Sequence, residues 1–250
     1  MAARTQSMTR GNPTRLILTF ALPLMVGNVF QQLYTVVDTM VVGKFLGVDA
    51  LAALGAADWM NWMMLSIVQG LTQGFAILMA REFGAGDHGR LRDVIGNSAI
   101  LAAVFSLLLT GLGQAAARPV LLLLQTPGDI LPSTLLYLRI MFLGTPIVMA
   151  YNLLACILRS LGDGRTPLEA MAVASVTNIV LDLIFVMVFH WGIGGAAAAT
   201  LIAQLVSGLF CLYHVGSWSC CACSAPTSVS KPKMSPSCWP WVLPWPSRTA

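Results

Sequence analysis

Charged residues are scarce in this chain. Lys, Arg, Asp and Glu together make up 10% of its 250 residues, against the roughly 25% that is typical of a soluble domain. Apolar residues account for 57%. A soluble globular domain needs a more charged surface than this, so the composition excludes that class and indicates a chain that lies in a lipid bilayer.

The sequence also lacks the motifs of an intramembrane enzyme. It contains no H-E-x-x-H motif and no motif that pairs a nucleophile with a base. Its three histidines, His88, His190 and His214, fall in loops or at the ends of predicted helices. An enzyme is therefore the weakest interpretation of this chain.

The sequence does contain long apolar stretches. A helix needs about 20 mostly apolar residues to cross the bilayer core, and six stretches reach that length. We expect an all-α integral membrane protein, a six-helix bundle within residues 1–215, with spans at about 16–42, 51–79, 94–117, 130–158, 168–189 and 193–215. Short loops rich in glycine separate the spans and leave no room for a domain outside the membrane.

Basic residues fall mainly in alternate loops. They precede the first span, lie between the second and third, and lie between the fourth and fifth, whereas the intervening loops hold only Lys44 and Arg118. Since cytoplasmic loops carry the excess of Lys and Arg, this multi-pass protein of the plasma (inner) membrane is predicted to have both termini in the cytoplasm. This sidedness accounts for the net charge of +4, so no nucleic-acid partner is expected.

Three aspartates lie within the spans. A charged side chain at the bilayer centre costs about 2.5 to 3.5 kcal/mol on insertion scales, so Asp38, Asp58 and Asp182 are functional candidates. Asp58 lies near an outer helix end beside Trp59 and Trp62. That position is typical of an interfacial residue, which leaves Asp38 and Asp182 as the stronger candidates.

The rise of a helix places polar residues beside these two aspartates. At 1.5 Å per residue, Asp38, Asp182 and Thr200 all lie within about 10 Å of the outer ends of their spans. Asn178 precedes Asp182 by four residues and so shares its helix face. The four side chains predict an oxygen-rich cluster for a proton or a small hard cation such as sodium.

Three further polar residues are candidates for lining a cavity. Gln31 and Tyr34 precede Asp38 by seven and four residues and share its face, while Asn152 lies midway along the fourth span. Ordinary hydrogen bonding between helices is an equally good explanation for all three.

Several motifs give the sequence a specific resemblance. The run ALPLMVGNVFQQLYTVVDTMVVGKFLGVDALAALG, the loop ILRSLGDGRTP, and NIVLDLIFV followed by GIGGAAAATLIAQ resemble, in order, the corresponding helices and loops of multidrug and toxin extrusion (MATE) transporters. The resemblance covers residues 15–215. In that family the cation site uses an Asp on the first helix, an Asn and an Asp four apart on the fifth, and a Thr on the sixth. Asp38, Asn178, Asp182 and Thr200 match these positions.

The resemblance implies one lobe of a twelve-helix transporter. It implies export of small organic, often cationic, compounds in exchange for protons or sodium ions, without any metal or other cofactor. The second lobe would come either from a second copy of the chain or from a missing carboxy-terminal half, and one lobe alone is expected to be inactive. The alternative is a lipid-linked oligosaccharide flippase of the same superfamily, which would not require the Asp38 and Asp182 cluster.

Composition changes abruptly in residues 216–250. This tail holds four of the six cysteines and four of the seven tryptophans, without the paired spacing of a zinc site. Because Cys and Trp codons both begin with TG, a displaced reading frame gives Leu, Met or Val at each of these residues, as an apolar helix requires. We therefore interpret the tail as an out-of-frame reading of a longer transporter gene.

Overall fold

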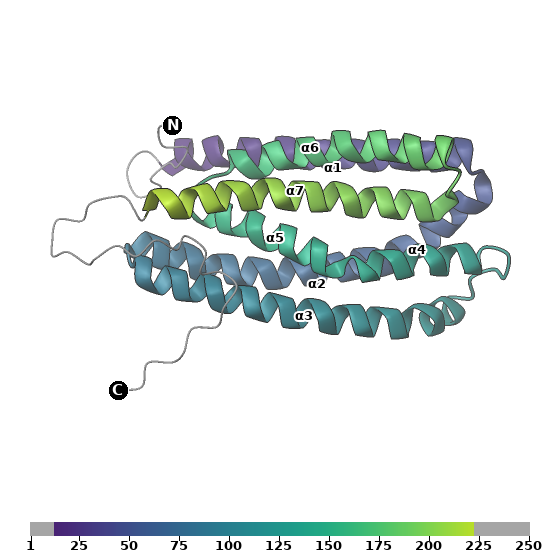
Figure 1. Cartoon of the computed structure of the whole chain (residues 1–250), viewed down its shortest axis with the longest axis horizontal. Helices are drawn as coiled ribbons and strands as arrows, with labels where there is room; N and C mark the ends of the chain where they lie inside the picture. The colour runs from purple at the N-terminus through teal and green to yellow at the C-terminus, as the bar shows by residue number, and fades with distance from the viewer. Residues whose placement is uncertain (1–12, 223–250) are drawn as a thin grey trace.

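The protein is a bundle of long helices in this computed structural model, which describes residues 13–222. Residues 1–12, most of the tail (223–250), and the side chains of 13–24, 26, 30, 31, 34, 88 and 217–222 lie outside the described part. The elements are α1 (Pro13–Phe45), α2 (Val48–Ala85), α3 (His88–Leu123), α4 (Leu131–Leu143), α5 (Thr145–Ser160), α6 (Arg165–Leu183), the π-helix η1 (Ile184–Val188) and α7 (Gly192–Ala222). Figure 1 shows them running along one axis, with the start of α1 and the end of α7 at the same end.

The expected helical bundle is confirmed. Each predicted span coincides with one helix or with two consecutive helices, and most of these helices extend beyond the predicted bounds. Hydropathy marks only the part of a helix that suits the bilayer core, whereas backbone hydrogen bonding continues into polar ends such as Arg81 and Glu82 of α2. Within the described residues, four helices and the bent α4–α5 pair are long and apolar enough to cross a membrane. Helix α1, with 33 residues, is the remaining predicted span.

The fourth span differs from the single helix that its hydropathy predicts. It consists of α4 and α5, which meet at Gly144 with a bend of 47°. Pro146 has no N–H and leaves the carbonyl of Phe142, four residues earlier, without its helical donor. The hydroxyl of Thr145 donates to that carbonyl at 2.8 Å. The bend therefore keeps its polar backbone satisfied, as the membrane interior demands.

Two short turns at one end of the bundle are held by aspartate side chains. Gly86 ends α2 in the left-handed region (φ 75°), and Asp87 then accepts a hydrogen bond from the backbone N–H of Arg90 to cap α3. Asp163 is buried and accepts hydrogen bonds from the backbone N–H and the hydroxyl of Thr166. Aspartate is favoured at such positions because it satisfies the free N–H groups at a helix start.

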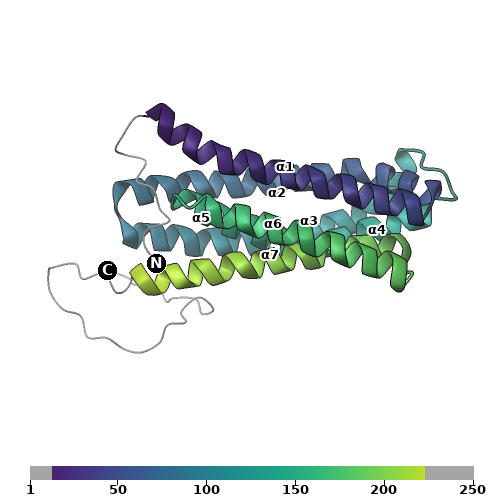
Figure 2. The same ribbon diagram turned by 90° about the horizontal axis from the view of Figure 1, so that it is seen from above.

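Packing of the bundle leaves α1 at its edge. Helix α7 packs against α5 and α6, and α6 is the main neighbour of α1, as Figure 2 shows from above. The outer faces are apolar; Ile100, Val104 and Leu107 share one face of α3 and are all more than half exposed. A patch of this kind is unfavourable in water, so it indicates the face that meets lipid.

The bend depends on the absence of a side chain at Gly144. A Cβ added there would lie 2.8 Å from Cγ of Leu201 on α7 and closer still to its methyl groups. We expect Gly144→Ala to lower the free energy of unfolding by about 1 to 3 kcal/mol, the usual range for overpacking. The measurement is the melting temperature of the detergent-solubilised protein, followed by size-exclusion chromatography after heating.

Gly111→Ala on α3 is the matched control, because no atom lies within 4 Å of an added Cβ at that site. It should leave the melting temperature unchanged or raise it slightly, since alanine favours helix over glycine. Leu201→Ala should lower the melting temperature less in the Gly144→Ala variant than in the parent protein, because it makes room for the added methyl group. Equal melting temperatures for the two glycine variants would contradict this account of the bend.

Candidate functional site

Two polar residues of α6 lie fully inside the bundle. Asp182 has no exposed surface and Asn178 is 2% exposed. Both carboxylate oxygens of Asp182 and the side-chain oxygen of Asn178 have no hydrogen-bond donor within the described part of the chain. Buried acceptors without donors are costly, so this site requires a proton, a cation or water.

Asp38 approaches the same place from α1. Its carboxyl group is close enough to that of Asp182 for the two side chains to interact directly, and its Oδ1 is also buried without a donor. Two carboxylates at this separation repel each other when both are ionised. One shared proton or one cation between them would remove the repulsion.

Thr200 of α7 completes the cluster. Its Oγ1 accepts a hydrogen bond from Nδ2 of Asn178 at 3.3 Å and donates to the carbonyl of Ala196 at 3.1 Å. The amide nitrogen of Asn178 is thus held by Thr200, and its oxygen is left free for another partner. The structure therefore brings together all four residues of the predicted cluster, from three helices.

Oxygen dominates the chemistry of this cluster. It offers two carboxylates, one amide oxygen and one hydroxyl, and small hard cations prefer such oxygen ligands. Asp58 on α2 is exposed and adds negative charge that acts on Asp38. The arrangement is suited to holding and releasing a positive charge.

An irregular helix begins directly after this cluster. Residues Ile184–Val188 form the π-helix η1, and the chain then turns through His190 and Gly192, both with positive φ. Short π-helices occur frequently at functional sites. Phe185, Phe189 and Trp191 pack their rings together around the turn, with centroids 5.0 to 6.1 Å apart.

The three predicted cavity-lining residues have different outcomes. Gln31 and Tyr34 are on α1, but their side chains lie outside the described part of the structure. Asn152 is half-buried on α5, where its amide donates to the carbonyl of Val148 at 2.8 Å. Its neighbour Tyr151 lines a cavity, but Asn152 is not among the residues that line it. The role of Asn152 therefore stays a prediction.

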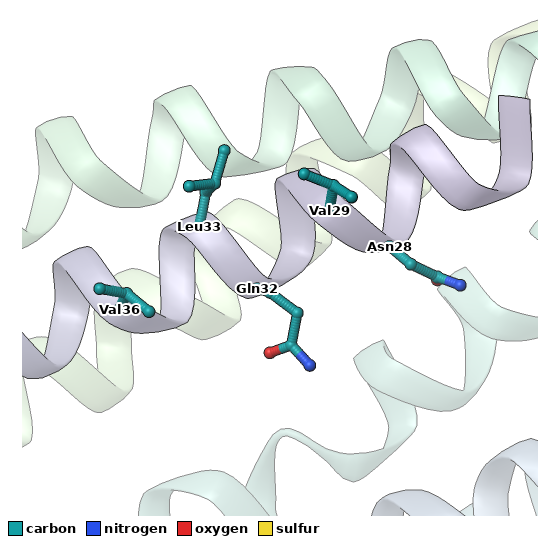
Figure 3. A pocket seen from close by; sticks show the side chains of 5 residues that line it. All are labelled: Asn28, Val29, Gln32, Leu33 and Val36. Carbon is teal, nitrogen blue, oxygen red and sulfur yellow. The ribbon is translucent and has the colours of Figure 1, made fainter.

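Sequence reasoning missed a polar stripe on α1, which we define as Asn28, Gln32, Thr35 and Thr39. All four residues are exposed, and their spacing of three to four residues places them on one helix face. Asn28 and Gln32 line a groove of about 280 Å³ together with the apolar side chains of Val29, Leu33 and Val36. Figure 3 shows the two amides pointing away from Val29 and Leu33. Helical periodicity of polar residues was the signal that could have found the stripe.

A second missed feature is a cavity of about 50 Å³ between α5, α6 and α7. Its polar lining includes Asn178 and Thr200 of the cluster, together with Tyr151, Ser175, Gln204 and Ser207. Gln204 follows Thr200 by one helical turn, and its Oε1 is buried without a donor. The cavity therefore continues from the cluster toward the middle of the bundle.

Comparisons with known proteins agree on one family. The MatE family model matches residues 23–184. The probable multidrug resistance protein YpnP of Bacillus subtilis is 31% identical over 212 residues, which cover 85% of this chain and 48% of that protein. The chain spans about half the length of the curated relatives it matches.

Solved structures are similar over the same part. A MOP superfamily transporter from Pyrococcus furiosus superposes with a TM-score of 0.76 at 32% identity, over 82% of this chain and 45% of that one. A multidrug resistance MATE family transporter in an outward-facing conformation gives a TM-score of 0.76 at 31% identity, with the same coverage. The bundle is thus equivalent to about half of each of these transporters.

Proposed function

Because the chain belongs to the MatE family, whose members are transporters and not enzymes, we propose that it forms one lobe of a cation-coupled exporter of small organic compounds. The coupling ion is a proton or sodium, and its site consists of Asp38, Asn178, Asp182 and Thr200. The exported compounds are drug-like and cationic, in line with the multidrug resistance named for relatives.

One observation carries this proposal: the buried, unpaired carboxylate of Asp182 opposite Asp38. A purely structural acid inside a membrane bundle is normally paired with a donor or a basic residue. Here the described neighbours supply further oxygen acceptors instead. A mobile cation satisfies these acceptors while it is bound, and its release recreates the unfavourable state that drives the next binding event.

The polar stripe on α1 supports a transport path beside this site. The side-chain amides of Asn28 and Gln32 are exposed on a membrane helix, where contact of such polar side chains with lipid is unfavourable. We therefore assign this face to a water-filled path between two lobes. The second lobe comes either from a second copy of the chain or from a carboxy-terminal half, and a single lobe is inactive in transport.

Orientation in the membrane follows from the basic loops. The α2–α3 and α5–α6 connections share one end of the bundle with the start of α1 (Figure 1), and the arginines flank these connections. By the positive-inside rule this end faces the cytoplasm. The ion site then lies in the outer half of the plasma (inner) membrane.

Ion binding to the isolated chain provides the first test. We expect sodium, added in place of N-methylglucamine, or acidification at constant salt to raise the melting temperature of the purified protein. An ion at ten times its Kd stabilises the folded state by about 1.4 kcal/mol. Asp182→Asn should remove this gain because it removes a charged ligand.

Asp49→Asn is the matched control for this test. Asp49 is an exposed aspartate in the first turn of α2, so its replacement should leave the ion-dependent gain intact. If neither sodium nor acidification stabilises the parent protein, the proposed ion site is wrong.

Transport itself is tested in a version of the protein that contains both lobes. Asp182→Asn should abolish export of a fluorescent organic cation from cells, while the amount of protein in the membrane stays the same. Export by Asp49→Asn should match the parent. Undiminished export by Asp182→Asn would rule out this carboxylate as the coupling site.

Topology is tested by cysteine labelling on intact cells. In a background with the tail cysteines replaced by serine, a membrane-impermeant maleimide should label Gly128→Cys in the α3–α4 loop. It should not label Gly89→Cys in the first turn of α3 until the cells are permeabilised. The reverse pattern would show that the orientation is inverted.

A further inference from the structure

The cavity between α5, α6 and α7 has a lining with a surplus of acceptors. Oδ1 of Asn178 and Oε1 of Gln204 are both buried without a donor. Ser175 has already donated its hydroxyl hydrogen to the carbonyl of Met171 at 2.9 Å. Ser207 has done the same to the carbonyl of Ala170 at 2.9 Å. Lone pairs of all four oxygens remain available to a ligand that brings hydrogens.

The volume of this cavity fits water. A water molecule needs roughly 10 to 15 Å³ of this kind of volume and two to four polar partners, and the cavity offers about 50 Å³. Dry cavities are lined by apolar groups alone, whereas this largely apolar cavity also presents polar side chains from all three helices. Two buried amide oxygens without donors match the two O–H groups of one water molecule.

We infer that this cavity is a hydration chamber, which we define by Tyr151, Ser175, Asn178, Gln204 and Ser207, and that it holds ordered water against the amide oxygens of Asn178 and Gln204. Gln204 acts as a positioning residue. Through this water it fixes the orientation of the Asn178 amide, whose nitrogen is bonded to Thr200. The inference rests on the packing of α5, α6 and α7 and does not require the proposed transport.

On the side away from the aspartates, the chamber is bordered by tightly packed apolar side chains. Cys211, one turn beyond Ser207 on α7, forms a buried cluster with Leu158 and Ala170, and Tyr151 packs against this cluster. The chamber therefore adjoins the polar cluster through Asn178 and Thr200, which line it.

Radiolytic footprinting by synchrotron X-rays tests the chamber on the full chain. Hydroxyl radicals formed from bound water oxidise the side chains beside it, and Tyr151 and Met171 both line the cavity. We expect both to be oxidised, whereas the buried core residues Met79 and Met149 are not. After rapid mixing with ¹⁸O water, Tyr151 should still carry ¹⁶O when the exposed Tyr213 already carries ¹⁸O.

Gln204→Leu provides the variant, because leucine has a similar size and no acceptor. We expect the oxidation of Tyr151 and Met171 to be lost in this variant and kept in Gln73→Leu, which alters an exposed glutamine on α2. The comparison within the parent protein still decides the question if Gln204→Leu does not fold. The inference would be overturned if Tyr151 and Met171 were as unreactive as Met149. It would also be overturned if they incorporated ¹⁸O as fast as Tyr213. Ion binding and export are measured separately, so their failure does not affect this result.

Discussion

The absence of water from the bilayer core determines most of this structure. Every polar group inside the bundle must find a partner there, and most do so locally. The hydroxyl of Thr145 covers the carbonyl exposed by Pro146, and Asp163 covers the start of α6. Against this well-satisfied background, the unpaired oxygens of Asp38, Asn178 and Asp182 stand out as the place where something other than protein has to bind.

Composition and periodicity were sufficient to predict the architecture. The six spans, the short loops and the shared layer of Asp38, Asp182 and Thr200 all follow from hydropathy and from the rise of a helix. The division of the fourth span at Gly144 is indicated in the sequence by Pro146, which interrupts the helical hydrogen bonds. The close fit of Leu201 against Gly144 comes from another helix, and no local pattern contains that information.

The candidate site was predictable to a similar extent. Acidic residues within spans are recognisable as candidates because placing a charge in the membrane is energetically unfavourable. The four-residue spacing between Asn178 and Asp182 places both on one helix face. Gln204 was missed because a glutamine in a span has many ordinary explanations. Its significance comes from being buried without a donor beside a cavity, which is a property of three packed helices. Asn28 and Gln32 lie on a face of α1 next to that of Asp38, so the helical spacing from Asp38 does not lead to them.

The contact between Gly144 and Leu201 links two parts of the molecule mechanically. Leu201 directly follows Thr200, so the residue that fills the elbow of the fourth span is the chain neighbour of an ion-site residue. A change in the angle between α4 and α5 would alter the space that the side chain of Leu201 occupies beside Gly144. The shape of the fourth span and the position of Thr200 in the cluster are therefore linked through one side chain, that of Leu201.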